Sequence, residues 1–382
     1  MFRDVRIDQT LYSLSLLFVL GTRPEAIKLA PIIQRIRDDG GRTQILFTAQ
    51  HRTLAADVLD YFGIVPDHDL NIMTESQSPS GVAARVLEGI DPILVDQAPD
   101  IVVVQGDTTT AMAAALAAFH RRIPVAHVEA GLRSGVTKDP FPEEMNRRLI
   151  ARLASRHFAP TEQNRRNLIA EGVPDARITI TGNTVIDALE IIIADHRPEL
   201  VPSIAREILG RGRRMILLTT HRRENFGAGQ QGIFEAIGEI LTEDQEVEVV
   251  FPMHPNPEVA KGVGRHLPGH PRVHPIPPVA YPSFIHLLAR AWLVMTDSGG
   301  LQEEAPALGV PTLVLRRTTE RPELIASGSG ILVGIERDAI IEEVQRLRDD
   351  TLHYQRMSQP RYPFGQGGAA RKVANWLADV GG

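Results

Sequence analysis

Short apolar runs alternate with longer amphipathic stretches along the whole chain. In the first half, the apolar runs predict strands at residues 14–20, 44–48, 101–105, 124–128, 157–159 and 178–181. The stretches between them have apolar positions at helical spacing and predict helices at residues 24–37, 52–62, 81–97, 109–121, 143–154 and 162–170. Such alternation favours a parallel sheet with helices on both faces.

The alternation restarts in the second half. Strands are predicted at residues 215–219, 247–252, 273–276, 293–296, 312–315 and 330–333, and helices at residues 230–241, 281–289, 299–308, 339–348 and 369–380. Residues 195–214, which contain Pro198 and Pro202, are interpreted as an inter-domain connection. The predicted fold class is α/β, with two doubly wound Rossmann-like domains, residues 1–190 and 191–365, that face a central ligand-binding cleft.

Composition narrows the class of protein. The chain has 382 residues, 43% of them hydrophobic, no cysteine and a formal net charge of −6. The lack of cysteine excludes disulfides, thiolate metal sites and a cysteine nucleophile. The acidic balance argues against a non-specific nucleic-acid binder. The apolar run at residues 14–20 is too short for a membrane span, and the pattern does not predict a signal peptide. We therefore expect a cytoplasmic enzyme without membrane contact.

Two turns between a strand and a helix carry candidate anion-binding groups. In residues 21–28, Gly21 permits a tight turn, and free amides with Arg23 and Lys28 would bind an anion; the alternative is an ordinary turn with surface cations. Residues 297–304 repeat this pattern in the second domain. Ser298, Gly299 and Gly300 would let the backbone approach a ligand, and Glu304 could accept hydrogen bonds from sugar hydroxyls, unless this is a glycine-rich cap.

Acidic residues follow the predicted strands of the first domain. Asp107, Glu129 and Glu143 lie at strand ends or loops, where a carboxylate serves either as a helix cap or as an acid/base group. In the second domain His221 follows the first strand and can titrate near neutral pH, or be an ordinary loop histidine. The arginines at residues 316–321 form either a solvated loop or a diphosphate clamp.

The sequence does not predict a dinucleotide-binding turn, a P-loop or a metal site. Residues 227–232 match G-x-G-x-x-G, but residues 221–226 separate them from the preceding strand, and no P-loop motif exists. His266, His270 and His274 are interrupted by proline and glycine, so no metal site is predicted.

Together, these segments resemble the non-hydrolysing UDP-N-acetylglucosamine 2-epimerases over about residues 14–380. The matching stretches run in the family order: residues 21–31, 48–52, 105–110, 127–133, 141–147, 221–227, 296–306 and 318–323. The resemblance implies a two-domain architecture like that of the GT-B glycosyltransferases, and we expect residues 366–382 to pack back on the N-terminal domain. It also implies interconversion of UDP-GlcNAc and UDP-ManNAc, by anti elimination of UDP to 2-acetamidoglucal and re-addition, without an added cofactor.

The resemblance assigns residues by matching motif. Asp107, Glu129 and Glu143 would be the acid/base set, and His221 would assist the departing UDP. The residues that would bind the substrate are Arg23, Lys28, Phe284, Ser298, Gly299, Gly300, Glu304 and Arg321. A second UDP-GlcNAc, bound as an activator, would contact Gln50, His51, Arg52 and His254. Val279 departs from the family, which has a glutamine near the uracil, so base recognition would depend on backbone groups.

The family also implies a homodimer that supplies precursors of cell-surface polysaccharides. Three alternatives remain open at this stage: a UDP-sugar glycosyltransferase of the same architecture, a hydrolysing 2-epimerase, and a non-catalytic sugar-nucleotide sensor. An epimerase turns over UDP-GlcNAc without an acceptor, whereas a glycosyltransferase needs one. A hydrolysing 2-epimerase would release free UDP, and a sensor would bind UDP-GlcNAc without exchange of its C2 hydrogen.

Overall fold

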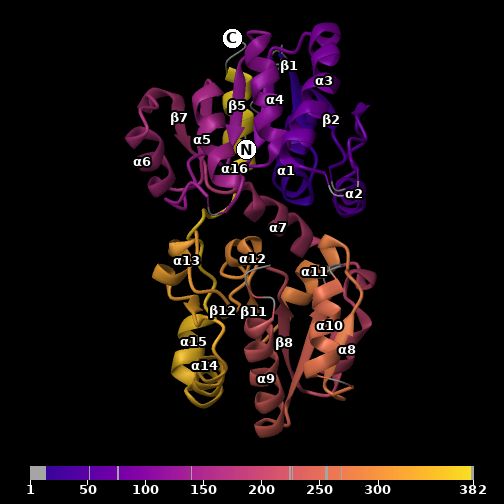
Figure 1. Ribbon diagram of the computed structural model, residues 1–382, viewed down its shortest axis with the longest axis vertical. Helices are drawn as coiled ribbons and strands as arrows, with labels where there is room; N and C mark the ends of the chain where they lie inside the picture. Colours follow the sequence, from indigo (N-terminus) through magenta and orange to yellow (C-terminus); the bar gives the residue numbers. More distant parts are fainter. Residues whose placement is uncertain are drawn as a thin grey trace, which may run out of the picture. The chain divides into compact units, whose positions relative to one another are not determined.

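The computed structural model describes residues 14–50, 52–74, 77–138, 140–222, 225, 227–253, 257–267 and 269–379. The chain divides into two compact units. Unit 1 comprises Met1–Ala188 and Phe364–Gly382, and unit 2 comprises Leu189–Pro363. Each unit contains one parallel sheet with helices on both faces, as the alternation of strands and helices predicted (Figure 1).

The described part of unit 1 contains a seven-stranded sheet in the order β3-β2-β1-β4-β5-β6-β7. Its strands are β1 (Ser15–Leu20), β2 (Arg42–Phe47), β3 (His68–Asp69), β4 (Ile101–Gln105), β5 (Val125–Val128), β6 (Arg156–Ala159) and β7 (Ile178–Ile180). All of the pairings are parallel. Because β4 is buried along its whole length, its apolar run is continuous rather than alternating.

The helices of unit 1 cover both faces of this sheet. They are α1 (Arg23–Asp38), α2 (Arg52–Tyr61), α3 (Pro79–Gln97), α4 (Thr109–His120), α5 (Glu143–Leu153), α6 (Glu162–Ala170) and α16 (Ala369–Asp379), while α7 (Thr184–Ala194) crosses the boundary between the units. The alanines of α4 pack among Leu17, Val102 and Val104 in the core, because small side chains permit close approach of a helix to the sheet.

Helix α16 returns to unit 1 from the far end of the chain. It lies against α1, as Figure 1 shows for the yellow helix among the indigo and magenta elements. Trp376 meets the ring of Phe158 edge-on, with 5.5 Å between centroids, and the guanidinium of Arg156 lies 4.3 Å from the centre of the Trp376 ring. These contacts anchor the helix by aromatic and cation–π packing.

The described part of unit 2 contains a six-stranded parallel sheet in the order β10-β9-β8-β11-β12-β13. Its strands are β8 (Arg214–Thr219), β9 (Val247–Pro252), β10 (Val273–Ile276), β11 (Leu293–Thr296), β12 (Thr312–Val314) and β13 (Gly330–Leu332). Phe234, Ile237, Val249, Phe251 and Met295 belong to its core. Trp292 stacks on Tyr354 with 5.7 Å between ring centroids.

The helices of unit 2 include several that the sequence pattern did not indicate. They are α8 (Ser203–Gly210), α9 (Ala228–Glu243), α10 (Pro257–His266), α11 (Tyr281–Leu288), α12 (Gly299–Glu304), α13 (Pro322–Ser327), α14 (Arg337–Asp349) and α15 (Thr351–Met357). Residues 195–214, interpreted from the sequence as a connection, contain α8, which packs on β8 and β9. Ala205 and Ile208 are buried there, so this part of the segment belongs to the core of unit 2.

The order of strands reverses once in each sheet. In unit 1, β1 and β4 are neighbours; the strands after β1 are added toward one edge of the sheet and the strands after β4 toward the other. In unit 2, β8 and β11 have the same relationship. Loops at the carboxyl ends of such strand pairs separate and form the usual ligand-binding point of an open α/β sheet. Some of the predicted site residues follow these strands, namely Arg23, Lys28, Asp107, His221, Ser298, Gly299, Gly300 and Glu304, whereas Glu129 follows β5 and Arg321 follows β12.

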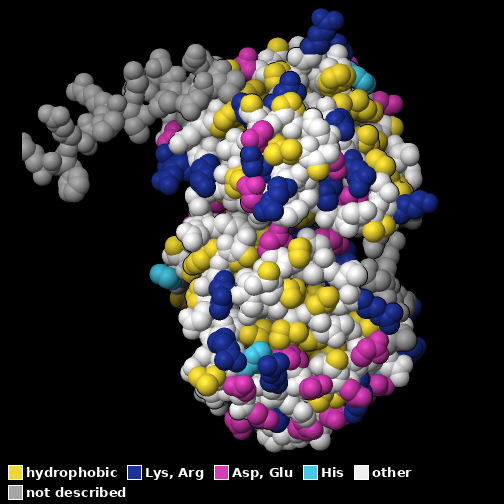
Figure 2. Space-filling view, turned by 90° about the vertical axis from the view of Figure 1, so that its left-hand side faces the viewer, with side chains coloured by type: hydrophobic (Ala, Val, Ile, Leu, Met, Phe, Trp, Pro, Cys, Tyr) yellow, Lys and Arg dark blue, Asp and Glu magenta, His cyan; other side chains and the backbone are white. Residues whose placement is uncertain are grey.

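On the face shown in Figure 2, acidic and basic side chains are interspersed over the surface rather than gathered in one large basic patch. Among the described residues, no helix is both long and apolar enough to cross a lipid bilayer.

Candidate active site

Glu129 directly follows β5 and has a left-handed backbone conformation, with φ of 63°. Its carboxylate forms an ion pair with Lys28 of α1 and accepts hydrogen bonds from the amides of Gln105 and Asn183, the latter at 3.1 Å. A strained conformation at a non-glycine residue is typical of functional sites when the surroundings hold it in place. Here three donors from separate elements fix the carboxylate.

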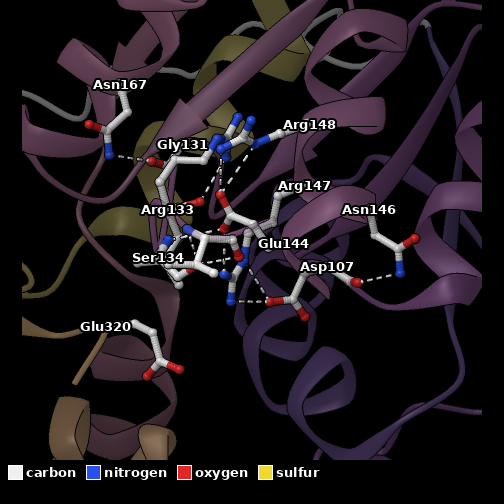
Figure 3. Close-up of polar contacts among 12 residues, drawn as sticks. Asp107, Gly131, Arg133, Ser134, Glu144, Asn146, Arg147, Arg148, Asn167 and Glu320 are labelled. Atoms are coloured by element: carbon white, nitrogen blue, oxygen red, sulfur yellow. Dashed lines mark hydrogen bonds and ion pairs between the residues drawn. The ribbon is translucent and has the colours of Figure 1, made fainter. Parts of the chain in front are cut away.

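Asp107 follows Gly106, which lies close to this carboxylate. A Cβ built on Gly106 would lie 3.5 Å from Oε2 of Glu129, so the turn after β4 approaches the end of β5 closely. Arg147 of α5 donates from Nε to Oδ2 of Asp107 at 2.9 Å, and Asn146 donates to the Asp107 carbonyl at 2.9 Å (Figure 3). The turn that carries Asp107 is therefore held by α5.

Glu143 is the first residue of α5 and is half-buried. The next residue, Glu144, is fully buried and accepts from Arg147 at 3.2 Å, from Arg148 and from the backbone N–H of Ser134 (Figure 3). Helix α5 thus begins with one half-buried carboxylate and one that anchors its first turn. The three predicted carboxylates come from the ends of β4 and β5 and from the start of a helix that contacts the β4 turn.

The turn at residues 21–28 differs from the expectation of free amides. The carboxylate of Glu25 accepts the backbone N–H groups of Gly21 and Thr22, at 3.0 and 2.8 Å, and the hydroxyls of Thr22 and Thr108. Burial raises the pKa of Glu25, while these hydrogen bonds act in the opposite direction. The amides of Gly21 and Thr22 are thus engaged by a side chain of the same turn, while the side chain of Arg23 is half-buried.

Gly21 is required by a close contact. A Cβ at this position would lie 2.1 Å from Oγ1 of Thr48, nearer than atoms can approach without displacement. Thr48 in turn lies 3.2 Å from the hydroxyl of Thr110, which donates to Gln50 at 2.9 Å. Of the residues expected to hold an activator, this places Gln50 next to the β1 turn. His51, His254 and the side chain of Arg52 lie outside the described residues.

In unit 2, Asp297 organises the loop that carries His221. This fully buried carboxylate follows β11 and accepts the backbone N–H groups of His221 and Arg222, at 3.0 and 2.9 Å, and polar groups of Thr220 and Asn225 at 3.0 Å. The ring Nδ1 of His221 lies 3.3 Å from Oδ1 of Asp297, and about a third of the side chain is exposed. The loop thus presents a histidine whose ring is oriented by a buried acid.

Arg321 belongs to a buried charge network at the start of α13. It donates from Nε to Glu303 at 2.9 Å and lies 3.7 Å from Glu320, which Arg316 contacts at 2.8 Å. Burial raises the pKa of Glu320, but Arg321 and Arg316 outweigh this effect and lower it to about 2. The guanidinium of Arg321 also lies beneath Gly299, where a Cβ would be 3.3 Å from its central carbon.

The remaining predicted ligand-binding residues of unit 2 surround the same turn. Ser298 occupies the N-cap position of α12 without a capping hydrogen bond from its side chain, and Gly299 and Gly300 are the first two residues of that helix. Glu304 accepts a hydrogen bond from the Tyr281 hydroxyl at 2.7 Å, which ties α12 to the start of α11. Phe284 lies on α11 and is half-buried, and Val279 precedes that helix by two residues.

Several supporting residues were missed by sequence reasoning. Asp297 and Glu25 hold the turns that carry candidate residues and Asn183 contacts Glu129, but all three were given no role, and Arg147 holds Asp107. Thr22 and Glu25 have the spacing of a capping box, which was an available signal. Asn183 follows β7, far along the chain from Glu129, so no local pattern could pair them. Among the described residues, no cluster of three or more potential ligands for a metal ion is present.

The family model described as UDP-N-acetylglucosamine 2-epimerase matches residues 34–378. The UDP-N-acetylglucosamine 2-epimerase of Salmonella typhimurium is 48% identical over 370 residues, covering 95% of this chain and 98% of the relative.

Among solved structures, the UDP-GlcNAc 2-epimerase of Neisseria meningitidis bound to UDP-GlcNAc is 41% identical, with a TM-score of 0.89, over 96% of this chain and 100% of that one. The Methanocaldococcus jannaschii enzyme in complex with UDP-GlcNAc and UDP is 34% identical, with a TM-score of 0.82, over 96% and 100% of the two chains. The family model spans both units and all of the predicted site segments except the first, at residues 21–31. The chain belongs to the UDP-N-acetylglucosamine 2-epimerase family.

Proposed function

We propose that this protein catalyses the reversible C2 epimerisation of UDP-N-acetylglucosamine to UDP-N-acetylmannosamine without releasing free sugar. The observation that carries the proposal is the carboxylate of Glu129, held by Lys28, Gln105 and Asn183 beside the turn of Asp107. Membership of the family, with relatives named for this activity, supports the choice of substrate.

The chemistry explains why acidic groups are needed. The C2 hydrogen of the sugar is not acidic, so direct inversion is slow. Anti elimination breaks the C2–H and C1–O bonds, a base takes the proton, and UDP leaves with the bonding electrons, which gives 2-acetamidoglucal. Re-addition of UDP at C1, with protonation of C2 on the opposite face, gives the epimer. No net oxidation occurs, so the proposed cycle needs no added redox cofactor.

We assign the proton transfers to Asp107, Glu129 and Glu143 as a set and the assistance of the departing UDP to His221. General acids and bases contribute about 10²–10⁴-fold each when they are held within hydrogen-bonding reach of the reacting group. The ends of β4 and β5 and the start of α5 supply these carboxylates on supported turns. Asp297 orients the ring of His221 for a comparable role toward the leaving group.

The nucleotide would be bound by Arg23, Lys28, Phe284, Ser298, Gly299, Gly300, Glu304 and Arg321. Arg321 is held by Glu303 and lies under the glycine turn, so its guanidinium is pre-organised for a diphosphate. Lys28 forms an ion pair with Glu129 and would act next to that carboxylate. Because Val279 replaces a side-chain amide, uracil recognition would depend on backbone groups.

The wider proposal includes a homodimer, a second UDP-GlcNAc that activates the enzyme near Gln50, and a cytoplasmic role in supplying precursors of cell-surface polysaccharides. Family resemblance supports these three points.

The deciding experiment is incubation of UDP-GlcNAc alone in D2O, followed by proton NMR. The proposal requires UDP-ManNAc at equilibrium with UDP-GlcNAc and deuterium at C2 of both sugars. Stoichiometric free UDP with N-acetylmannosamine would indicate a hydrolysing enzyme instead. Turnover only when an acceptor is added would indicate a glycosyltransferase, and binding without C2 exchange would indicate a sensor.

A further inference from the structure

His127 is a buried side chain that the proposed mechanism does not use. It lies in β5, two residues before Glu129, and is 1% exposed. Its Nε2 lies 2.7 Å from the carbonyl oxygen of Gly106. Since a carbonyl oxygen can only accept, Nε2 carries the hydrogen and the ring donates to Gly106.

This hydrogen bond acts on the peptide group that leads into Asp107. Gly106 has a φ of 71°, so the chain turns sharply at this residue. Its N–H donates to the carbonyl of Val128 at 3.0 Å, and its own carbonyl accepts from His127. Two consecutive residues of β5 therefore hold both polar groups of Gly106, and the second of these contacts fixes the plane of the peptide bond to Asp107.

The same strand continues into Glu129. His127 lies within β5, and Glu129 is the first residue after that strand ends at Val128. The side chain that holds Gly106 and the backbone that presents Glu129 therefore belong to one short, continuous segment. Any tilt of the Gly106 peptide would move Asp107 relative to Glu129, whose Oε2 lies next to Gly106. We propose that His127 is a positioning residue that sets the separation of Asp107 and Glu129 through its hydrogen bond to the Gly106 carbonyl.

The protonation state of the His127 ring is consistent with a permanent hydrogen-bond donor at Nε2. Burial, with a contribution from His157, lowers the pKa of His127 to about 3, so the ring is neutral at working pH. Nδ1 is buried and has no hydrogen-bond partner among the described residues. In the neutral Nε2–H tautomer this atom is an acceptor; a protonated ring would instead leave a buried donor unpaired. His127 thus donates one hydrogen bond and takes no part in proton transfer.

The test compares two variants of nearly equal size and shape. In His127→Gln the amide can still donate from a position close to that of Nε2, whereas His127→Met fills the same space without a donor. A role in packing alone predicts equal behaviour of the two variants. Positioning predicts that His127→Gln keeps kcat within about threefold of the wild type and that His127→Met loses about tenfold or more, since small displacements of catalytic groups are costly.

The readouts separate positioning from general damage. With UDP-GlcNAc deuterated at C2, His127→Met is expected to show a larger isotope effect on kcat than His127→Gln, because removal of the C2 hydrogen becomes slower. The affinity for UDP, measured by calorimetry, stays within twofold for both variants. Equal kcat values and equal isotope effects in two folded variants would overturn the inference.

A second measurement does not depend on the variants folding. Nitrogen-15 NMR of histidine-labelled wild-type protein is expected to show two rings, those of His127 and His157, that stay neutral from pH 8 to pH 5, with His127 in the Nε2–H form. Protonation of every histidine ring by pH 5.5, or the opposite tautomer for His127, would refute the assignment. The inference rests on the proposed function, which exchange of the C2 hydrogen by the wild-type protein tests separately. Absence of that exchange would refute the proposed function. Normal exchange by the wild type, together with equal behaviour of the two variants, would refute only the role of His127.

Discussion

The carboxylate of Asp297 contacts His221 twice, accepting its backbone N–H at 3.0 Å and lying 3.3 Å from its ring Nδ1. One buried acid therefore fixes both the loop and the orientation of the ring. Asp297 follows β11 and His221 follows β8, the two neighbouring strands at which the order of the sheet reverses. The fold brings them together, although they are 76 residues apart in sequence.

Asp297→Asn is expected to damage unit 2 more than loss of one contact would suggest. The new amide group turns a donor toward groups that are themselves donors, so at least one hydrogen bond to a charged acceptor is lost. We expect a loss of about 3 kcal/mol in the free energy of unfolding of unit 2 and a lower kcat. Urea unfolding measures the first and product formation the second. Thr220→Val, which removes a single donor at 3.0 Å, is the matched control with a cost of about 1 kcal/mol. Equal stability of Asp297→Asn and the wild type would contradict the role of Asp297.

The three carboxylates of unit 1 give the sharpest test of the proposed chemistry. Asp107→Asn, Glu129→Gln and Glu143→Gln should each lower kcat by at least about 10²-fold, the usual scale for loss of a general acid or base. UDP affinity should survive in at least some of these variants. Glu162→Gln, on the exposed surface of α6, is the control and should keep the wild-type rate. If all three variants keep wild-type turnover, the acid/base assignment is wrong.

Arg321→Ala should weaken nucleotide binding. A guanidinium that contacts the diphosphate stabilises the ground state as well as the transition state, so UDP affinity should fall by about 10–100-fold. Removal of the arginine also takes a partner from buried Glu303, and thermal unfolding will show that cost separately. Arg317→Ala is the control, because Arg317 is exposed and pairs with Glu336 at the surface. Unchanged UDP affinity in folded Arg321→Ala would remove Arg321 from the site.

The buried histidines of unit 1 predict a dependence of stability on pH. Burial lowers the pKa of His127 to about 3 and that of His157 to about 4. In the unfolded chain both titrate near 6.5, so between pH 6.5 and 4 unfolding takes up protons that the folded state does not bind. Stability should therefore fall as pH falls through this window, by about 1.4 kcal/mol per pH unit for each histidine.

Urea titrations of the wild type and His157→Gln at pH 7, 6 and 5 will measure this slope. The variant should lose about half of the slope that the two histidines contribute. Parallel curves for the two proteins would show that His157 is charged in the folded state or does not differ from the unfolded chain.

Much of the fold could be predicted from the sequence because buried parallel strands form short, continuous apolar runs. β4, β9, β10 and β11 have the predicted bounds. Three of the missed helices begin at or after a proline: α10 and α13 begin at Pro257 and Pro322, and α8 follows Pro202, whereas α15 begins after Asp350. Proline suits the first turn of a helix, where its missing N–H has no partner, but Pro202 was interpreted as part of a connection.

The candidate site was predictable as a set of residue types at strand ends, and less so as a set of contacts. Strand–helix alternation indicates which residues reach the carboxyl edge of a sheet, and Asp107, Glu129 and His221 do so. Pairs such as Lys28 with Glu129, 101 residues apart, depend on strand order, which local patterns do not contain. At the turn of Gly21 the sequence pattern predicted free backbone amides, but the side chain of Glu25 accepts the N–H groups of Gly21 and Thr22.

The return of α16 to unit 1 has a practical consequence for spectroscopy. The sequence contains two tryptophans, and this helix carries one of them, Trp376, into unit 1, whereas Trp292 belongs to unit 2. Each half of the molecule thus has its own intrinsic fluorophore. Replacing either indole by phenylalanine leaves an emission signal that reports a single half, so the order in which the halves melt can be followed without any attached dye.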